Sequence, residues 1–129
     1  MLGLERLALK KLNQLSGGEL QKVVIARALA QEARVLLLDE PTNNLDLKSQ
    51  LELMRLVKKL SVERGITVLL VVHDVNIALR FADEFIFMKD GKIIVKGDHK
   101  IVKPELIGEV YGIPVTIHRI SGVPVVVPV

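Results

Sequence analysis

The sequence contains no cysteine and no tryptophan, and aromatic residues make up only 3% of its 129 positions. Without cysteine, the chain has no disulfide framework, no thiolate metal site and no cysteine nucleophile. The hydrophobic fraction is nevertheless 50%, which is high for a soluble chain of this length. We therefore expect a chain of about the size of one domain, with a core built from leucine, valine and isoleucine.

Long apolar runs and an excess of one charge are also missing. The apolar run at residues 66–72 is far shorter than the roughly 18 residues needed to span a bilayer, and no charged leader precedes an apolar segment at the start of the chain. The 18 Lys and Arg exceed the 15 Asp and Glu by only three, and they are scattered rather than gathered in a stripe. These features favour a reducing cytosol and argue against a nucleic-acid partner.

Two short aliphatic runs predict the strands of a parallel sheet. Residues 35–38 are all aliphatic and are followed by Asp39-Glu40-Pro41, which predicts a buried strand ended by proline. Residues 66–72 predict a second buried strand that ends in His73-Asp74. A helical segment lies between the two runs, and the order strand, helix, strand predicts parallel pairing with a right-handed crossover.

Helix signals surround these strands. Asp46 is placed to cap a helix over residues 47–64, and Gly65 is placed to end it. Apolar residues recur at spacings of three and four over residues 18–31, which predicts an amphipathic helix, and residues 2–12 have helical character. Beyond His73 we expect helices over 76–82 and 104–110, a hairpin of 84–89 with 93–96 around Asp90-Gly91, and a terminal hairpin of 115–117 with 123–127. The fold class is α/β with antiparallel hairpins at the C-terminal end.

Polar side chains follow both predicted strands, at the edge where open parallel sheets bind ligands. Asp39 and Glu40 end the first strand, and His73 ends the second. Adjacent strand residues point to opposite faces, so we expect one carboxylate to hold a cation and the other to reach a different atom, such as an attacking water. Each feature taken alone is also compatible with a polar strand end or a structural histidine without function.

A second candidate site lies in LSGGELQ, residues 15–21. Ser16 and Glu19 have the spacing of a capping box, so helix stability alone explains both residues. Gly17 and Gly18 are not explained in this way, because glycine is unfavourable in the first turn of a helix. Two glycines would let an anion such as phosphate approach the N–H groups at the positive end of the helix.

Taken together, LSGGELQKVVIARALAQEARVLLLDEPTNNLD and VLLVVHD resemble the ABC-type ATPases, over about residues 12–97. The resemblance implies a partial P-loop NTPase core with parallel strands and helices, followed by C-terminal antiparallel hairpins. It also implies one partial domain over residues 1–129. In this domain, 1–31 end the helical subdomain, 32–98 form the core, and 99–129 form the terminal helix and hairpin.

The resemblance implies a role for each motif residue. Asp39 is similar to the aspartate that holds Mg²⁺, Glu40 to the catalytic glutamate that polarises the attacking water, and His73 to the switch histidine at the γ-phosphate. The signature loop of the family, which binds ATP held by the opposite subunit, corresponds to Ser16, Gly17, Gly18 and Glu19. Asp46 corresponds to an aspartate at the dimer seam. The reaction implied is phosphoryl transfer from ATP to water.

The sequence departs from the family pattern in one respect. It contains no G-x-x-x-x-G-K-[ST] loop, whose N–H groups and lysine bind the phosphates, and its only Gly-Lys pair is Gly91-Lys92. The chain therefore resembles the C-terminal half of an ATPase subunit. We expect the isolated chain to bind neither ATP nor Mg²⁺ normally, and to self-associate or to need a missing N-terminal half. The family also implies a membrane permease as partner, at the cytoplasmic face of the membrane.

The C-terminal segment VYGIPVTIHRISGVPVVVP is similar to the ends of importer ATPases for iron chelates, haem and cobalamin. Two other functions stay open at this point. One is a non-catalytic remnant that acts as an interaction module. The other is a small metal- or anion-binding protein that uses Asp39, Glu40 and His73.

Overall fold

The computed structural model describes residues 2–129, which form two compact units. The first unit ends at His73, and the second is Asp74–Val129. Each unit has its own hydrophobic cluster. The three segments expected within one partial domain, residues 1–31, 32–98 and 99–129, stay a prediction.

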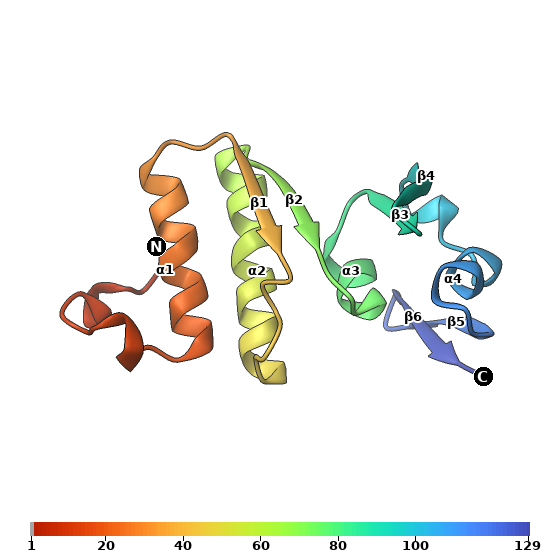
Figure 1. Ribbon diagram of the computed structural model, residues 1–129, viewed down its shortest axis with the longest axis horizontal. Coiled ribbons are helices and arrows are strands. Elements are labelled where there is room, and N and C mark those ends of the chain that lie inside the picture. The colour runs from red at the N-terminus through yellow and green to blue at the C-terminus, as the bar shows by residue number, and fades with distance from the viewer. Residues whose placement is uncertain (1) are drawn as a thin grey trace. The chain divides into compact units, whose positions relative to one another are not determined.

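The first unit consists of two helices and a small parallel sheet. Its main elements are α1 (Gly17–Ala30), β1 (Val35–Asp39), α2 (Leu47–Arg64) and β2 (Thr67–Val71). Figure 1 shows α1 beside α2, with β1 and β2 lying along α2. β1 and β2 are parallel, with Leu37 paired to Leu69 and Asp39 to Val71, so the predicted parallel pairing is confirmed.

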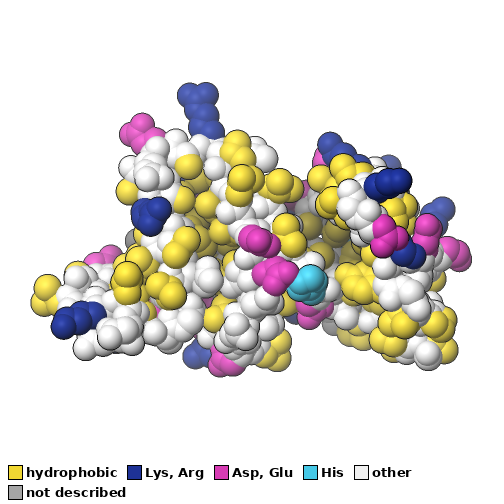
Figure 2. All heavy atoms as spheres, viewed as in Figure 1, with side chains coloured by type: hydrophobic (Ala, Val, Ile, Leu, Met, Phe, Trp, Pro, Cys, Tyr) yellow, Lys and Arg dark blue, Asp and Glu magenta, His cyan; other side chains and the backbone are white. Residues whose placement is uncertain are grey.

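Both strands were expected to be buried, and this prediction is wrong for one face. Leu36 and Leu38 are each only 6% exposed and pack against α2, whereas Leu37 is 69% exposed and Leu69 is 52% exposed. Alternate strand residues point to opposite faces, and within residues 2–129 only one face of this sheet is covered. Figure 2, in the same orientation as Figure 1, shows apolar side chains over β1 and β2.

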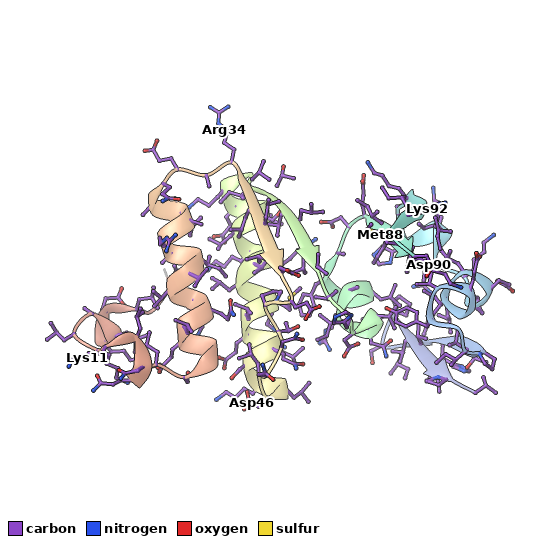
Figure 3. The ribbon with its side chains drawn as sticks, in the orientation of Figure 1. Lys11, Arg34, Asp46, Met88, Asp90 and Lys92 are labelled. Carbon is purple, nitrogen blue, oxygen red and sulfur yellow. The ribbon has the colours of Figure 1, made fainter. Side chains whose placement is uncertain are left out.

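α2 begins and ends where the sequence predicted. The Asp46 carboxylate accepts a hydrogen bond from the Ser49 backbone N–H at 2.9 Å, and Figure 3 shows Asp46 at this end of the helix. Hydrogen bonding from the Ser49 side chain, followed by that from its backbone, lowers the pKa of Asp46. Gly65, with φ of 62°, adopts the left-handed conformation that ends the helix. Buried side chains line one side of α2: Leu53, Met54, Val57 and Leu60.

The N-terminal segment is less regular than expected. Residues 2–12 contain one 3₁₀ turn, Glu5–Leu7, and a second turn, Leu12–Gln14, begins at the end of the segment. Leu7 is buried, but Leu9 is fully exposed, so the leucines do not share one buried face. A helix with its apolar residues on several sides gains little from packing, which explains why no longer helix forms here.

The second unit contains α3 (Val75–Phe81), β3 (Phe85–Lys89), β4 (Lys92–Gly97), α4 (Pro104–Tyr111), β5 (Val115–Ile120) and β6 (Val123–Pro128). A 3₁₀ turn, His99–Ile101, precedes α4. β3 pairs with β4, and β5 with β6, both antiparallel, so the two predicted hairpins are confirmed. Asp90 and Gly91 both have positive φ, 50° and 73°, as expected for the tight turn between β3 and β4.

The core of the second unit joins its helices to both hairpins. The buried residues come from α3, β3, α4, β5 and β6: Leu79, Phe85, Phe87, Ile107, Val115 and Val126. Asn76 ties α3 to β6, because its side chain donates to the carbonyl of Val126 at 3.2 Å and accepts from the N–H of Val126 at 2.7 Å. The amide side chain thus pairs with the edge of β6 as a neighbouring strand would.

No helix within residues 2–129 is both long enough and apolar enough to cross a membrane.

Candidate functional site

Glu40 and His73 lie together at the carboxyl ends of β1 and β2. The backbone N–H of Glu40 donates to the carbonyl of Val71 at 2.9 Å, which extends the pairing of the two strands by one bond. Nε2 of His73 pairs with Oε1 of the Glu40 carboxylate. The sequence placed both residues at this edge, and the structure brings them into direct contact.

Glu40 is not part of the strand itself. β1 ends at Asp39, and Glu40 has φ of 47°, in the left-handed region that only a few per cent of non-glycine residues adopt. The strand alternation expected to separate the two carboxylates therefore does not govern Glu40. Their surroundings still differ, because Asp39 is exposed and makes no side-chain hydrogen bond or ion pair among the described residues, whereas Glu40 is half-buried and bonded.

Three hydrogen bonds from two side chains hold the loop after β1, and the sequence reasoning missed all three. The Asn43 side-chain amide donates to Oε2 of Glu40. The Gln50 side-chain amide, from α2, donates to the backbone carbonyls of Leu45 at 3.0 Å and of Thr42 at 3.4 Å. Thr42, only 7% exposed, anchors the middle of the loop. The spacing of Asn43 to Glu40 is that of one turn, but no local signal in the sequence distinguishes Asn43 from its neighbour Asn44.

The capping box at the start of α1 is confirmed. The Ser16 hydroxyl accepts from the Glu19 N–H at 3.2 Å, and the Glu19 carboxylate accepts from the Ser16 N–H at 3.1 Å. The other oxygen of Glu19 forms an ion pair with Arg6 at 3.4 Å. A hollow of about 120 Å³ lies over this helix end. Its lining comes from the first unit: Arg6, Ser16, Gly18, Glu19, Lys22, Ser49 and Glu52.

Close packing accounts for at least one glycine that the sequence reasoning left unexplained. A Cβ atom at Gly17 would lie 2.9 Å from Cδ2 of Leu45, which is closer than carbon atoms pack, and one at Gly18 would lie 3.4 Å from Cβ of Ser49. The start of α1 therefore approaches the start of α2 closely. This packing places Ser16 near the helix that Asp46 caps, and it gives Gly17 a structural role besides any approach of an anion.

The donor set is compatible with a hydrated Mg²⁺ ion at Asp39 but not with a closed metal site made by this chain. Asp39 offers one free, exposed carboxylate, and Mg²⁺ commonly binds through one or two carboxylates and waters. Among the residues that the structure describes, no three His, Cys, Asp or Glu side chains gather to hold a metal ion. A self-sufficient metal site formed by Asp39, Glu40 and His73 therefore finds no support in the geometry.

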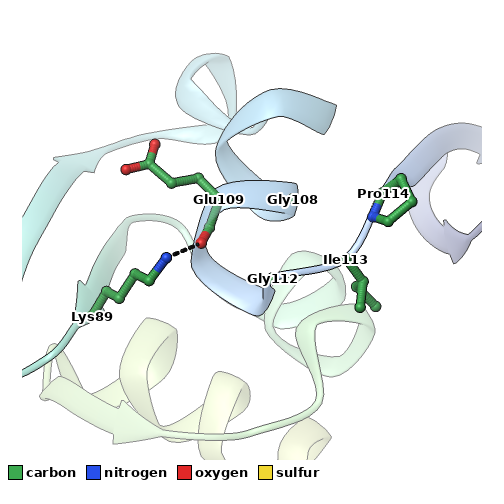
Figure 4. A pocket seen from close by; sticks show the side chains of 6 residues that line it. All are labelled: Lys89, Gly108, Glu109, Gly112, Ile113 and Pro114. Carbon is green, nitrogen blue, oxygen red and sulfur yellow. Dashed lines mark hydrogen bonds between the residues drawn. The ribbon is translucent and has the colours of Figure 1, made fainter.

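A second surface depression lies in the second unit, away from these residues in sequence. It is a hollow of about 430 Å³ lined by Lys89, Gly108, Glu109, Gly112, Ile113 and Pro114. Figure 4 shows Lys89, whose ammonium group donates to the backbone carbonyl of Glu109 at 2.7 Å near the end of α4. None of the site residues predicted from the sequence lines this hollow.

Comparison with known proteins agrees with the motifs and the fold. The family model described as "ABC transporter" matches residues 1–43. The ABC transporter ATP-binding protein MJ0089 of Methanocaldococcus jannaschii, itself uncharacterized, is 54% identical over all of this chain and 51% of its own length. The ferric enterobactin transport ATP-binding protein FepC of Escherichia coli is 43% identical over 98% of this chain and 48% of its own length.

Solved structures give the same result. A structure described as an inward-facing, metal-chelate type ABC transporter superimposes with a TM-score of 0.90 and 28% identity, over 99% of this chain and 53% of the other. The dimeric ATP-binding cassette MJ0796 with ADP and Pi superimposes with a TM-score of 0.63 and 48% identity, over 73% of this chain and 40% of the other. The fold is that of a P-loop NTPase of the ABC type, and the chain belongs to the ABC transporter ATP-binding family. It spans about half the length of the curated relatives it matches.

Proposed function

We propose that this chain supplies the water-activating half of an ATPase subunit that drives import of a metal chelate. The contact of His73 with Glu40, at the end of the strand that carries Asp39, is the observation that carries the proposal. The relative named for ferric enterobactin transport and the solved metal-chelate type transporter support the choice of solute class.

The proposed roles follow from the positions of the side chains. When bound, Mg²⁺-ATP supplies the phosphoryl group and the cation that neutralises its charge. Glu40 orients the attacking water and accepts its proton, while Asp39, exposed at the strand end, holds the hydrated cation. His73 keeps the Glu40 carboxylate in place and offers its imidazole to the phosphate.

A separate surface would bind the ATP that the opposite subunit holds. Ser16, Gly17, Gly18 and Glu19 lie at the positive end of α1, beside the start of α2 that Asp46 caps. The backbone N–H groups of Gly17 and Gly18, which the capping box does not use, and the Ser16 hydroxyl are suitable donors for the γ-phosphate of ATP held by a second subunit. The dimeric structures of the similar cassette MJ0796 support such a pairing.

The test compares two proteins. One is the 129-residue chain alone, and the other is a fusion protein in which this chain replaces the matching half of MJ0089. We expect no Mg²⁺-dependent ATP binding by the 129-residue chain in calorimetry, because its sequence contains no phosphate-binding loop. The fusion is expected to bind and hydrolyse ATP. If a folded fusion binds ATP but hydrolyses none, the interaction-module function is favoured instead.

We further propose that the open face of β1 and β2 is covered by additional protein in the functional state. The complete subunit would work beside a permease at the cytoplasmic face of the membrane. Val35, Leu37, Leu69 and Val71 lie on this face and are 49% to 69% exposed. Exposed apolar patches of this kind mark interfaces or aggregation sites.

This surface predicts that the isolated chain self-associates. In size-exclusion chromatography with light scattering, the average mass should rise with concentration, and Leu37→Lys should lower it, because a charge is costly to bury in an apolar contact. Val62→Lys is the matched control, since Val62 is 72% exposed on α2. A monomeric wild-type chain at all concentrations, or equal effects of the two lysines, would contradict the prediction.

A further inference from the structure

The backbone places Glu40 at a bend that needs support. Its N–H belongs to the pairing with β2, but its φ of 47° turns the chain out of the strand immediately afterwards. Such a conformation costs free energy for a residue with a side chain, and it persists only where the surroundings fix it. The groups in contact with the Glu40 carboxylate supply this support.

Both oxygens of the Glu40 carboxylate have a protein partner. His73 contacts Oε1, and the Asn43 amide donates to Oε2. The Asn43 N–H also donates to the backbone carbonyl of Glu40 at 3.1 Å, so backbone and side chain of Asn43 both bind the residue three positions earlier. The amide is a donor at every pH, whereas each imidazole nitrogen donates only in the appropriate protonation state. Asn43 is therefore the permanent donor to Glu40.

The turn that carries Asn43 is itself fixed from α2. The Gln50 amide reaches the carbonyls of Thr42 and Leu45, one on each side of Asn43 and Asn44. The Thr42 side chain is buried, which removes much of the freedom of the loop. A rigid turn of this kind can hold an exposed amide at a defined distance from the carboxylate.

We propose that Asn43 is a positioning residue for Glu40, and this inference rests on the proposed function. Asn43 fixes the rotamer of the Glu40 side chain, so that Oε1, the oxygen shared with His73, is the one presented to water. Gln50 contributes indirectly by keeping the turn closed. Asn43 itself touches neither the water nor the phosphate.

The first test uses the 129-residue chain without nucleotide. In the ¹⁵N-labelled protein, Glu40→Gln is expected to shift the side-chain amide signals of Asn43 and to leave those of the adjacent Asn44 in place. The two asparagines are both exposed and one residue apart, so Asn44 is an internal control. Equal shifts, or no shift at Asn43, would overturn the proposed contact.

The second test measures hydrolysis in the fusion. Asn43→Asp places a negative charge against Glu40 and is expected to lower kcat about 10- to 100-fold, because small displacements of a reacting group have effects of this size, while KM for ATP changes less than twofold. Asn43→Ala should lower kcat by a smaller factor. Asn44→Asp, with the same change of charge, should keep the wild-type kcat.

The outcomes separate this inference from the function on which it rests. Hydrolysis that requires Glu40 but is equal in wild type and Asn43→Asp overturns the inference alone. A well-folded fusion without any hydrolysis removes the proposed function as well. A loss in Asn43→Asp accompanied by an altered far-ultraviolet circular dichroism spectrum is a folding defect, and Asn43→Ala, which adds no charge, then decides the case by its kcat.

Discussion

Replacing Glu40 by glutamine is expected to lower ATP hydrolysis by the fusion roughly 10²- to 10⁴-fold, the range lost with a general base. Glutamine has nearly the same shape but cannot accept a proton from water. KM for ATP should change little, because Glu40 is proposed to act on the water rather than on binding. Steady-state phosphate release at several ATP concentrations gives both constants.

Glu32→Gln is the matched control for this change. Glu32 is an exposed glutamate with φ of 54°, so the substitution again removes one carboxylate from a residue in the left-handed region. It lies between α1 and β1, outside the candidate site. We expect wild-type hydrolysis from Glu32→Gln. Equal losses in both variants would show a general effect of charge or folding and would contradict the catalytic role of Glu40.

The parts of the fold that follow from local chemistry could be predicted from the sequence. Asp46 and Gly65 define the ends of α2 because capping and the left-handed stop depend on residues within one turn. The hairpin at Asp90-Gly91 is likewise set by its turn. In each case the interacting groups are neighbours in the chain, so the local sequence is sufficient to predict the helix end or the turn.

The exposure of the strands could not be predicted in this way. An unbroken aliphatic run is typical of a strand covered on both sides, and Leu37 and Leu69 belong to such runs. Whether both faces are covered depends on elements that lie far away in the sequence or in another chain. Within residues 2–129 only α2 and its neighbours supply cover, and they cover one side.

The candidate site shows the same limit. The residue types at the strand ends predicted that Glu40 and His73 share one edge, because parallel strands place their carboxyl ends together. The contacts of Asn43 and Gln50 depend instead on how the loop after Pro41 folds back on α2.

The pairing of Asn76 with Val126 spans 50 residues and has no periodic signal at all. Long-range polar contacts of this kind become visible only in three dimensions.

The packing of α2 affects the candidate site because this helix supports the sheet that positions Glu40. Leu60 is fully buried among residues of α1, α2, β1 and the segment before β2, including Leu36, Leu38 and Ile66. Leu60→Ala removes the isopropyl group of the side chain and leaves a cavity, which is expected to lower the free energy of unfolding by about 2–5 kcal/mol. Native domains have only about 5–15 kcal/mol in total, so a large share of the stability would be lost.

Val62→Ala on the same helix is the control. Val62 is 72% exposed, so the change removes little packing, and alanine has the higher helix propensity. We expect its effect to stay within about 0.5 kcal/mol. Urea unfolding followed by circular dichroism measures both variants, at one protein concentration because association alters apparent stability. If Leu60→Ala were no more destabilising than Val62→Ala, α2 would not be the support of β1, and the placement of Glu40 would need another explanation.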